Sequence, residues 1–214
     1  MRLALDLPTA LLAECSPLAD LDYAVASRVL SDDAYAAFYA GQARSGREII
    51  LDNPATADGP PLSLPEVSQA VLRVVPTFVL AKADTDPVQA LLAFRALSHA
   101  VSGHTGVGVT LCGATQTERT HLFLAVHKEA AMLCLPGTEQ GVTWLEELWD
   151  VCRMTIWPPY LHFINVGDYL VMEHFRDVCE DLGLPRRRIS THIDMLGWEP
   201  SDAPRAIAIF RTHI

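Results

Sequence analysis

The sequence lacks the cysteine pattern of a disulfide-rich or zinc-binding protein. Its five cysteines are scattered over 214 residues, and the closest two, Cys134 and Cys152, are 18 residues apart. An odd, unclustered set is typical of free thiols rather than of a disulfide framework. There is no CxxC and no HExxH motif either. We therefore expect no metal site and no cofactor.

Long apolar runs are also missing. No stretch reaches the length of a membrane span, and Asp6 and Glu14 interrupt the N-terminal segment where a signal peptide would be apolar. We expect a cytoplasmic protein with no membrane partner. The sequence leaves the oligomeric state open.

Basic residues are scarce. The chain has 16 Lys and Arg against 26 Asp and Glu, which gives a net charge of −10. Such a chain lacks the overall field of a nonspecific nucleic-acid binder, although a local basic patch could still contact phosphates. One basic run exists, formed by Arg186, Arg187 and Arg188. Its alternative interpretation is a solvated loop before a strand.

The chain has no glycine-rich nucleotide-binding motif, neither GxGxxG nor GxxxxGK[ST]. What it has is a high apolar content, 50% of its residues, which is enough for a sizeable core. Without a linker or a repeat, residues 1–214 are expected to form one domain.

Short apolar or β-branched runs alternate with longer amphipathic segments, as in βα units with a parallel sheet. The second of these runs could equally be helical. The expected strands are Arg2–Asp6, Asp22–Val29, Glu48–Asp52, Thr77–Ala81, Gly106–Leu111, Ala131–Leu135, Tyr160–Asn165 and Arg188–Asp194.

Helix starts are marked by capping boxes, in which a hydroxyl and a glutamate three residues later satisfy free backbone N–H groups. The pairs are Ser63 with Glu66, Thr115 with Glu118 and Thr143 with Glu146. Helical periodicity covers Val88–Val101, Gln116–Lys128 and Asp168–Leu182. The fold class is α/β, and a compact (β/α)₈ TIM-type barrel is expected, with an open parallel α/β sheet as the alternative.

In parallel α/β folds the active site lies where the strands end. Carboxylates stand at three of these ends, Asp52, Asp84 and Asp194, and small residues stand at others. Two carboxylates in one pocket can differ in pKa, so that one attacks or stabilises charge while the other handles protons. The alternative for each Asp is a helix cap or a turn.

Two further residues are candidates. His192 lies two positions before Asp194 and would share its face of a strand, either as a base or as a hydrogen-bonded interior histidine. Cys112 ends a strand, but the sequence gives it no evident base partner.

The ordered strand ends resemble the tRNA-guanine transglycosylase superfamily, in particular its short phage-encoded branch associated with 7-deazaguanine modification of DNA. The resemblance covers most of the chain. It is carried by residues 31–67, with a Tyr/Phe-rich segment leading into EIILDN, and by FVLAKAD, GVTLCGATQTE, LCLPG, FINVG and STHIDMLGWEP.

The resemblance implies a glycosyltransferase that exchanges guanine in a nucleic acid for a 7-deazaguanine base, with DNA preferred over tRNA as the substrate. A phage-encoded enzyme of this kind would act in the cytoplasm of the host cell. By position, Asp194 would attack C1′ to form a covalent sugar intermediate and Asp52 would handle protons. Arg186–Arg188 would contact phosphates. The base pocket would be formed by Asn53, Asp84, Cys112, Gly113, Gly167 and His192.

The sequence departs from the family pattern at Pro54, Ala83, Cys112 and Met195, and it lacks the zinc-binding cysteines of the tRNA enzymes. Two other hypotheses therefore stay open. One is a different barrel enzyme acting on a small molecule or nucleoside, and the other is a non-catalytic barrel that serves as a binding or assembly protein.

Overall fold

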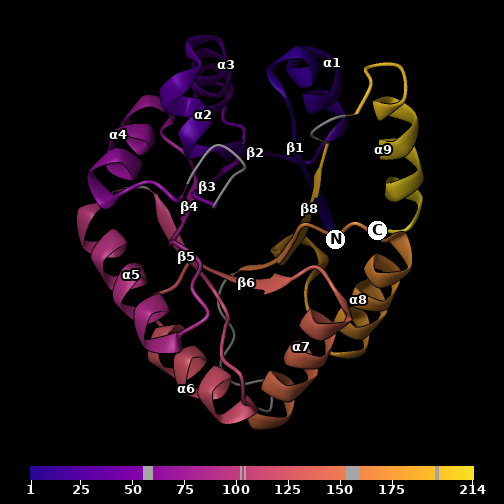
Figure 1. The fold of residues 1–214 in the computed structure, drawn as a ribbon. Coiled ribbons are helices and arrows are strands. Elements are labelled where there is room, and N and C mark those ends of the chain that lie inside the picture. The colour runs from indigo at the N-terminus through magenta and orange to yellow at the C-terminus, as the bar shows by residue number, and fades with distance from the viewer. Residues whose placement is uncertain (55–59, 102, 104, 153–159, 196–197) are drawn as a thin grey trace. The chain divides into compact units, whose positions relative to one another are not determined.

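The computed structural model describes all residues except 55–59, 102, 104, 153–159 and 196–197. Its strands form a closed parallel barrel in chain order, with helices between them, so the fold is the expected (β/α)₈ barrel and the open sheet is excluded (Figure 1). The strands are β1 Arg2–Asp6, β2 Leu21–Val25, β3 Ile49–Asp52, β4 Phe78–Leu80, β5 Gly106–Thr110, β6 Met132–Pro136, β7 Tyr160–Ile164 and β8 Ile189–Asp194.

Helices follow the strands. They are α1 Leu12–Cys15, α2 Ala26–Ser31, α3 Asp33–Arg44, α4 Leu64–Val74, α5 Pro87–Ala100, α6 Gln116–Val126, α7 Glu139–Cys152, α8 Tyr169–Asp181 and α9 Ala203–Thr212, with 3₁₀ turns η1 Thr9–Leu11, η2 Ser16–Leu18 and η3 Arg186–Arg188. None of the helices in the described part of the chain combines the length and the hydrophobicity of a membrane span.

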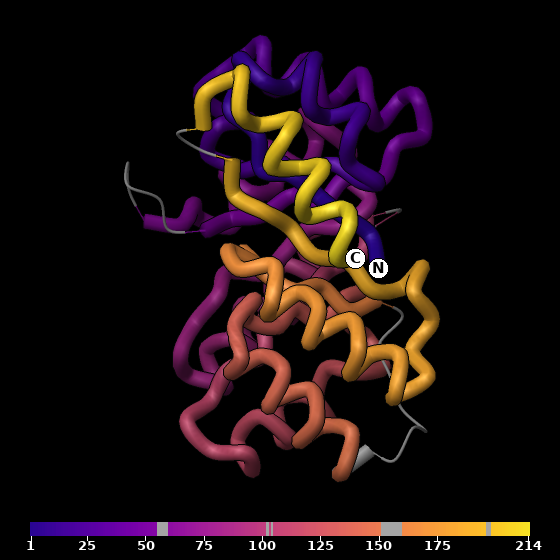
Figure 2. Tube along the Cα trace, turned by 90° about the vertical axis from the view of Figure 1, so that its right-hand side faces the viewer, coloured from indigo at the N-terminus to yellow at the C-terminus, as the bar shows by residue number. Residues whose placement is uncertain are grey.

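The chain divides into two compact units, residues 1–21 with 134–214, and residues 22–133. The expectation of one domain over residues 1–214 stays a prediction. The first unit contains both ends of the chain, which lie close together (Figures 1 and 2). In this unit β1 and β7 each pair with β8 in parallel. In the second unit the parallel pairs are β2–β3, β3–β4 and β4–β5.

Seven of the expected strands agree with the structure to within one or two residues at each end. The second expected strand, Asp22–Val29, is too long, because β2 ends at Val25 and helix α2 begins at Ala26. The helical alternative thus holds for the second half of that segment.

Two of the three expected capping boxes are confirmed. The Glu66 carboxylate accepts from the Ser63 backbone N–H at 2.8 Å, and the Glu118 carboxylate accepts from the Thr115 N–H at 3.0 Å. The third is wrong, since α7 begins at Glu139 and Thr143 therefore lies within the helix. Its hydroxyl donates to the Glu139 carbonyl at 3.1 Å, which is the usual bond of a hydroxyl inside a helix.

Gly141 permits the first turn of α7 to approach the end of β6. A Cβ at Gly141 would lie 1.9 Å from the Pro136 carbonyl oxygen, closer than any non-bonded contact allows. By contrast, a Cβ at Gly41 in α3 would meet only the Arg44 side chain, at 3.9 Å. A methyl group would therefore clash with the backbone at Gly141 but find room at Gly41.

We predict opposite effects of alanine at these two positions. Gly141→Ala should lower the free energy of unfolding by about 1–3 kcal/mol, the usual cost of overpacking. Gly41→Ala should raise it by about 0.5–1 kcal/mol, because alanine favours the helix and no clash opposes it. Urea unfolding of the two variants measures both effects, and a stable Gly141→Ala protein would contradict the close approach of α7 to β6.

Candidate active site

Strand β8 carries a row of polar side chains. Ser190, His192 and Asp194 occupy alternate positions and so share one face of the strand, whereas Thr191 and Ile193 lie on the other face. Ser190 and His192 are buried, and Asp194 at the strand end is half-buried. The row thus runs from the buried part of the strand to the end where barrel enzymes place their active sites.

Packing of β7 against α8 shows which face this is. The Phe163 ring lies 3.6 Å, centroid to centroid, from the Phe175 ring of α8, so Phe163 faces the helix. Its neighbour His162 therefore points to the opposite face, where its Nδ1 lies 2.9 Å from the Ser190 hydroxyl. We call this face, turned away from α8, the inner face.

Strand β1 adds a second carboxylate to the inner face. Asp6 is in register with Asp194, and Ala4 is in register with His192, so these pairs share a face. Neighbouring strands lie about 4.8 Å apart, which brings in-register carboxylates within reach of one small molecule. Asp6 is 7% exposed, and Ala4 adds little bulk beside His192.

The two histidines form a directed chain of hydrogen bonds. His192 Nδ1 lies 3.3 Å from the Asn165 backbone N–H, which can only donate, so this nitrogen accepts. His162 Nε2 lies 3.1 Å from the same atom and must donate to it. His162 Nδ1 then accepts from the Ser190 hydroxyl. A neutral His192 consequently carries its proton on Nε2.

Burial keeps both histidines uncharged. It lowers the pKa of His162 to about 3. It also lowers the pKa of His192 well below the ordinary value, and the neighbouring His162 lowers it further. Neither ring is therefore an acid–base group near neutral pH.

The site offers two carboxylates above a neutral imidazole donor. Carboxylates can remove and return protons, and a fixed N–H can hydrogen-bond to a carbonyl or hydroxyl oxygen. Among the described residues, no group of three or more His, Cys, Asp or Glu is arranged to hold a metal ion.

Asp52, the expected proton-handling residue, closes β3 in the second unit. Its carboxylate accepts from the Tyr23 hydroxyl at 2.5 Å and from the Asn53 backbone N–H at 2.7 Å. Burial raises the pKa of Asp52, while these two hydrogen bonds act in the opposite direction and are outweighed. Asp52 and Asp194 belong to different units, and their meeting in one site stays a prediction.

Asn53 is buried and has a structural task. Its side-chain amide donates to the Leu62 carbonyl at 3.0 Å and its side-chain oxygen accepts from the Leu62 N–H at 2.8 Å. Both polar ends of the amide are thereby used to fix the segment before α4, as in a pair of backbone hydrogen bonds.

The other residues expected to line a base pocket have local roles or open surroundings. Asp84 forms a turn, since its carboxylate accepts from the Asp86 N–H at 3.0 Å. Cys112 is a buried thiol whose pKa is raised to about 11, first by burial and then by nearby acidic residues, so it is no thiolate nucleophile.

The two glycines expected in the base pocket have no side chain to offer it. Gly113 has φ +127°, and its backbone carbonyl accepts a hydrogen bond from the Arg119 guanidinium at 2.9 Å. Gly167 is exposed, with open space around its Cα.

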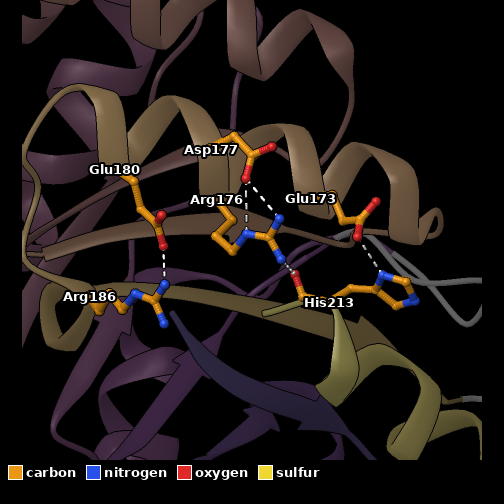
Figure 3. Close-up of polar contacts among 6 residues, drawn as sticks. All are labelled: Glu173, Arg176, Asp177, Glu180, Arg186 and His213. Carbon is orange, nitrogen blue, oxygen red and sulfur yellow. Dashed lines mark hydrogen bonds and ion pairs between the residues drawn. The ribbon is translucent and has the colours of Figure 1, made fainter.

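The arginine cluster lies at the other end of β8 from Asp194. Arg186–Arg188 form η3, directly before the strand, and Asp194 is the last residue of the strand. Arg186 is paired with Glu180 of α8, next to a second set of contacts that joins Glu173, Arg176 and Asp177 to His213 (Figure 3). The structure therefore does not bring the arginines to the strand end that holds Asp194.

Three residues of the candidate site are not among those expected from the sequence, namely Asp6, His162 and Ser190. Asp6 closes the apolar strand RLALD in the same way as Asp194 closes ISTHID, so the signal was present. His162 and Ser190 become visible only through the register of β7 against β8.

No protein-family model and no curated protein sequence matches the chain. Its fold is similar to that of KGPDC from Streptococcus mutans, with 11% identity, a TM-score of 0.58 and coverage of 99% of this chain and 98% of that one. It is also similar to dihydrodipicolinate synthase from Agrobacterium tumefaciens, with 10% identity, a TM-score of 0.62 and coverage of 99% and 73%. Oxaloacetate acetylhydrolase in complex with oxalate gives 11% identity, a TM-score of 0.59 and coverage of 99% and 81%. At these identities the likeness shows the fold alone.

We predict that the two histidines make stability depend on pH. Their folded-state pKa values are lowered, so the unfolded chain binds more protons as the pH falls below about 6.5. His162 should cost about 2 kcal/mol of unfolding free energy between pH 7 and pH 5, and His192 should act in the same direction. His162→Gln should remove about that much of the difference in urea unfolding, and His192→Gln should also reduce the difference. His99→Gln, at an exposed position, is the control, and an equal pH dependence in all variants would contradict the buried neutral pair.

Proposed function

We propose that the chain is an enzyme that transfers protons on a small, uncharged polar molecule at the ends of β1 and β8. The observation that carries this is the register of Asp6 with Asp194 on the inner face, above the buried histidine pair. Two carboxylates repel a further anion, so the reacting part of the substrate is uncharged and bears a carbonyl or hydroxyl group.

Each residue has a distinct part in this proposal. Asp194, the more exposed of the two carboxylates, takes or gives the proton of the substrate. Asp6, in register with Asp194 on the neighbouring strand, supplies the second carboxylate that faces the substrate. His192 donates from Nε2 to the oxygen on which charge develops, and Ser190 and His162 position it.

The similar folds support an enzyme of small molecules. The names of dihydrodipicolinate synthase and oxaloacetate acetylhydrolase are enzyme names, and the latter structure holds the small product oxalate. The position of Arg186–Arg188, at the other end of β8 from Asp194, supports a small-molecule substrate, because the arginine run expected to contact phosphates does not lie at this strand end.

The test is proton exchange in D₂O. The protein is incubated with a panel of uncharged hydroxy and oxo compounds and nucleosides, and NMR follows deuterium incorporation and product formation. Asp194→Asn and Asp6→Asn should each lower the rate by about 10²–10⁴-fold, the usual worth of acid–base catalysis. Asp181→Asn, an exposed residue at the end of α8, is the matched control and should keep the rate. Full activity in both site variants would refute the proposal.

Guanine exchange in nucleic acid, with a 7-deazaguanine as the incoming base, is the second candidate. It is favoured by the raised pKa of Asp52, which suits a proton-holding acid, and by the place of Asp194 at the end of β8. The observed roles of Asp84 and Cys112 do not add to it.

Labelled-guanine release from DNA and tRNA tests this candidate. Wild-type protein should release guanine and form an adduct that survives denaturing electrophoresis, and Asp194→Asn should form none because its amide is not a nucleophile. Asp52→Asn should slow exchange while still permitting the adduct. An adduct in Asp194→Asn would disprove the assignment of the nucleophile, and no release from either nucleic acid would reject base exchange.

A further inference from the structure

A second potential binding site lies in the unit of residues 22–133. It is a cavity of about 320 Å³ beside α4 and α5, and its size is at the lower end of the range of about 300–1,000 Å³ for small-molecule pockets. Its walls are mostly apolar, with Leu62, Leu64 and Val67 on the side of α4 and Ala93, Ala96 and Leu97 on α5.

The cavity is kept open by two features. Asn53 holds Leu62 in place through its pair of hydrogen bonds, so the segment before α4 cannot collapse inward without breaking them. On α5, Ala93 and Ala96 lie three positions apart on one side of the helix, where larger side chains would fill the space.

Among the described residues of the lining, Lys82 is the one cationic side chain and none is acidic. It follows β4 by two residues, and its exposed ammonium makes no hydrogen bond or ion pair with another residue in the described part of the chain. It is one of only two lysines in a chain of net charge −10.

The other polar side chains that the structure describes in the lining, Asn53 and Ser63, are already engaged. Both ends of the Asn53 amide bond to Leu62, and the Ser63 hydroxyl donates to the Glu66 carboxylate at 2.5 Å. A ligand therefore finds apolar walls and a single available charge. This combination matches a molecule with an apolar body and one anionic end.

We propose that this cavity binds a small monocarboxylic acid with an apolar body, such as a medium-chain fatty acid, and that Lys82 holds its carboxylate. The apolar part lies against Leu62, Leu64, Val67 and Leu97, where burial drives binding. The carboxylate forms a charge-assisted hydrogen bond with the ammonium. The carboxylates of β1 and β8 belong to the other unit.

Calorimetry with octanoate tests the proposal, with octanol as the uncharged probe of the same body. Octanoate should bind wild-type protein, and Lys82→Gln should weaken it by about ten-fold or more, as expected for loss of a hydrogen bond between charged groups. Lys82→Gln should leave octanol binding unchanged. Lys128→Gln, the other exposed lysine, is the matched control and should bind octanoate like wild type.

Filling the cavity gives a second measurement. Ala93→Leu should abolish binding of both probes, and Ala96→Leu serves the same purpose should circular dichroism show that Ala93→Leu does not fold. Asp194→Asn should keep wild-type affinity for octanoate, which separates this site from the proposed active site. No binding of octanoate at millimolar concentration, or equal affinity in wild type and Lys82→Gln, would overturn the proposal.

Discussion

The alternation of side chains between the two faces of a strand is the constraint on which the candidate active site depends. In β7 it turns Phe163 toward Phe175 of α8 and His162 to the opposite face. In β8 the same alternation places Thr191 and Ile193 on one face of the strand. The other face carries Ser190, His192 and Asp194. A shift of one residue would exchange these sets, so the apolar packing against α8 also fixes the polar face.

Two histidines can be buried on that face at a low energetic cost because their ring nitrogens hydrogen-bond to each other and to neighbouring groups. A buried polar group without a partner costs about 1–3 kcal/mol, and here the Ser190 hydroxyl, His162 and the Asn165 N–H supply partners along one chain. Asn165 has φ 55°, a left-handed conformation that asparagine tolerates better than most residues. The turn after β7 thereby places a backbone donor against His192 and decides which nitrogen carries the proton.

Much of this fold is accessible from the sequence, because apolar runs and capping residues are local signals. The strands and two capping boxes follow from them, and Asp6 could have been found by applying the strand-end argument to RLALD. The position of Arg186–Arg188 also follows from chain order, since residues before a strand lie at its other end from Asp194. The partnership of His162 with Ser190 could not be foreseen, because it depends on the register between two strands.

Burial and hydrogen bonding act in opposite directions on the carboxylate of Asp52, which closes β3. Asp52 is half-buried beside two hydrogen-bond donors, Tyr23 and the Asn53 N–H, and the cost of desolvating its charge outweighs them, so its pKa rises. A carboxyl group in that setting retains a proton more readily but has both oxygens engaged. Asp194 stands half-buried at the end of a polar row, with a second carboxylate in register beside it. The carboxylates of Asp6 and Asp194 thus share one face of two neighbouring strands, whereas the Asp52 carboxylate is held by a donor from β2 and by the backbone at the end of its own strand.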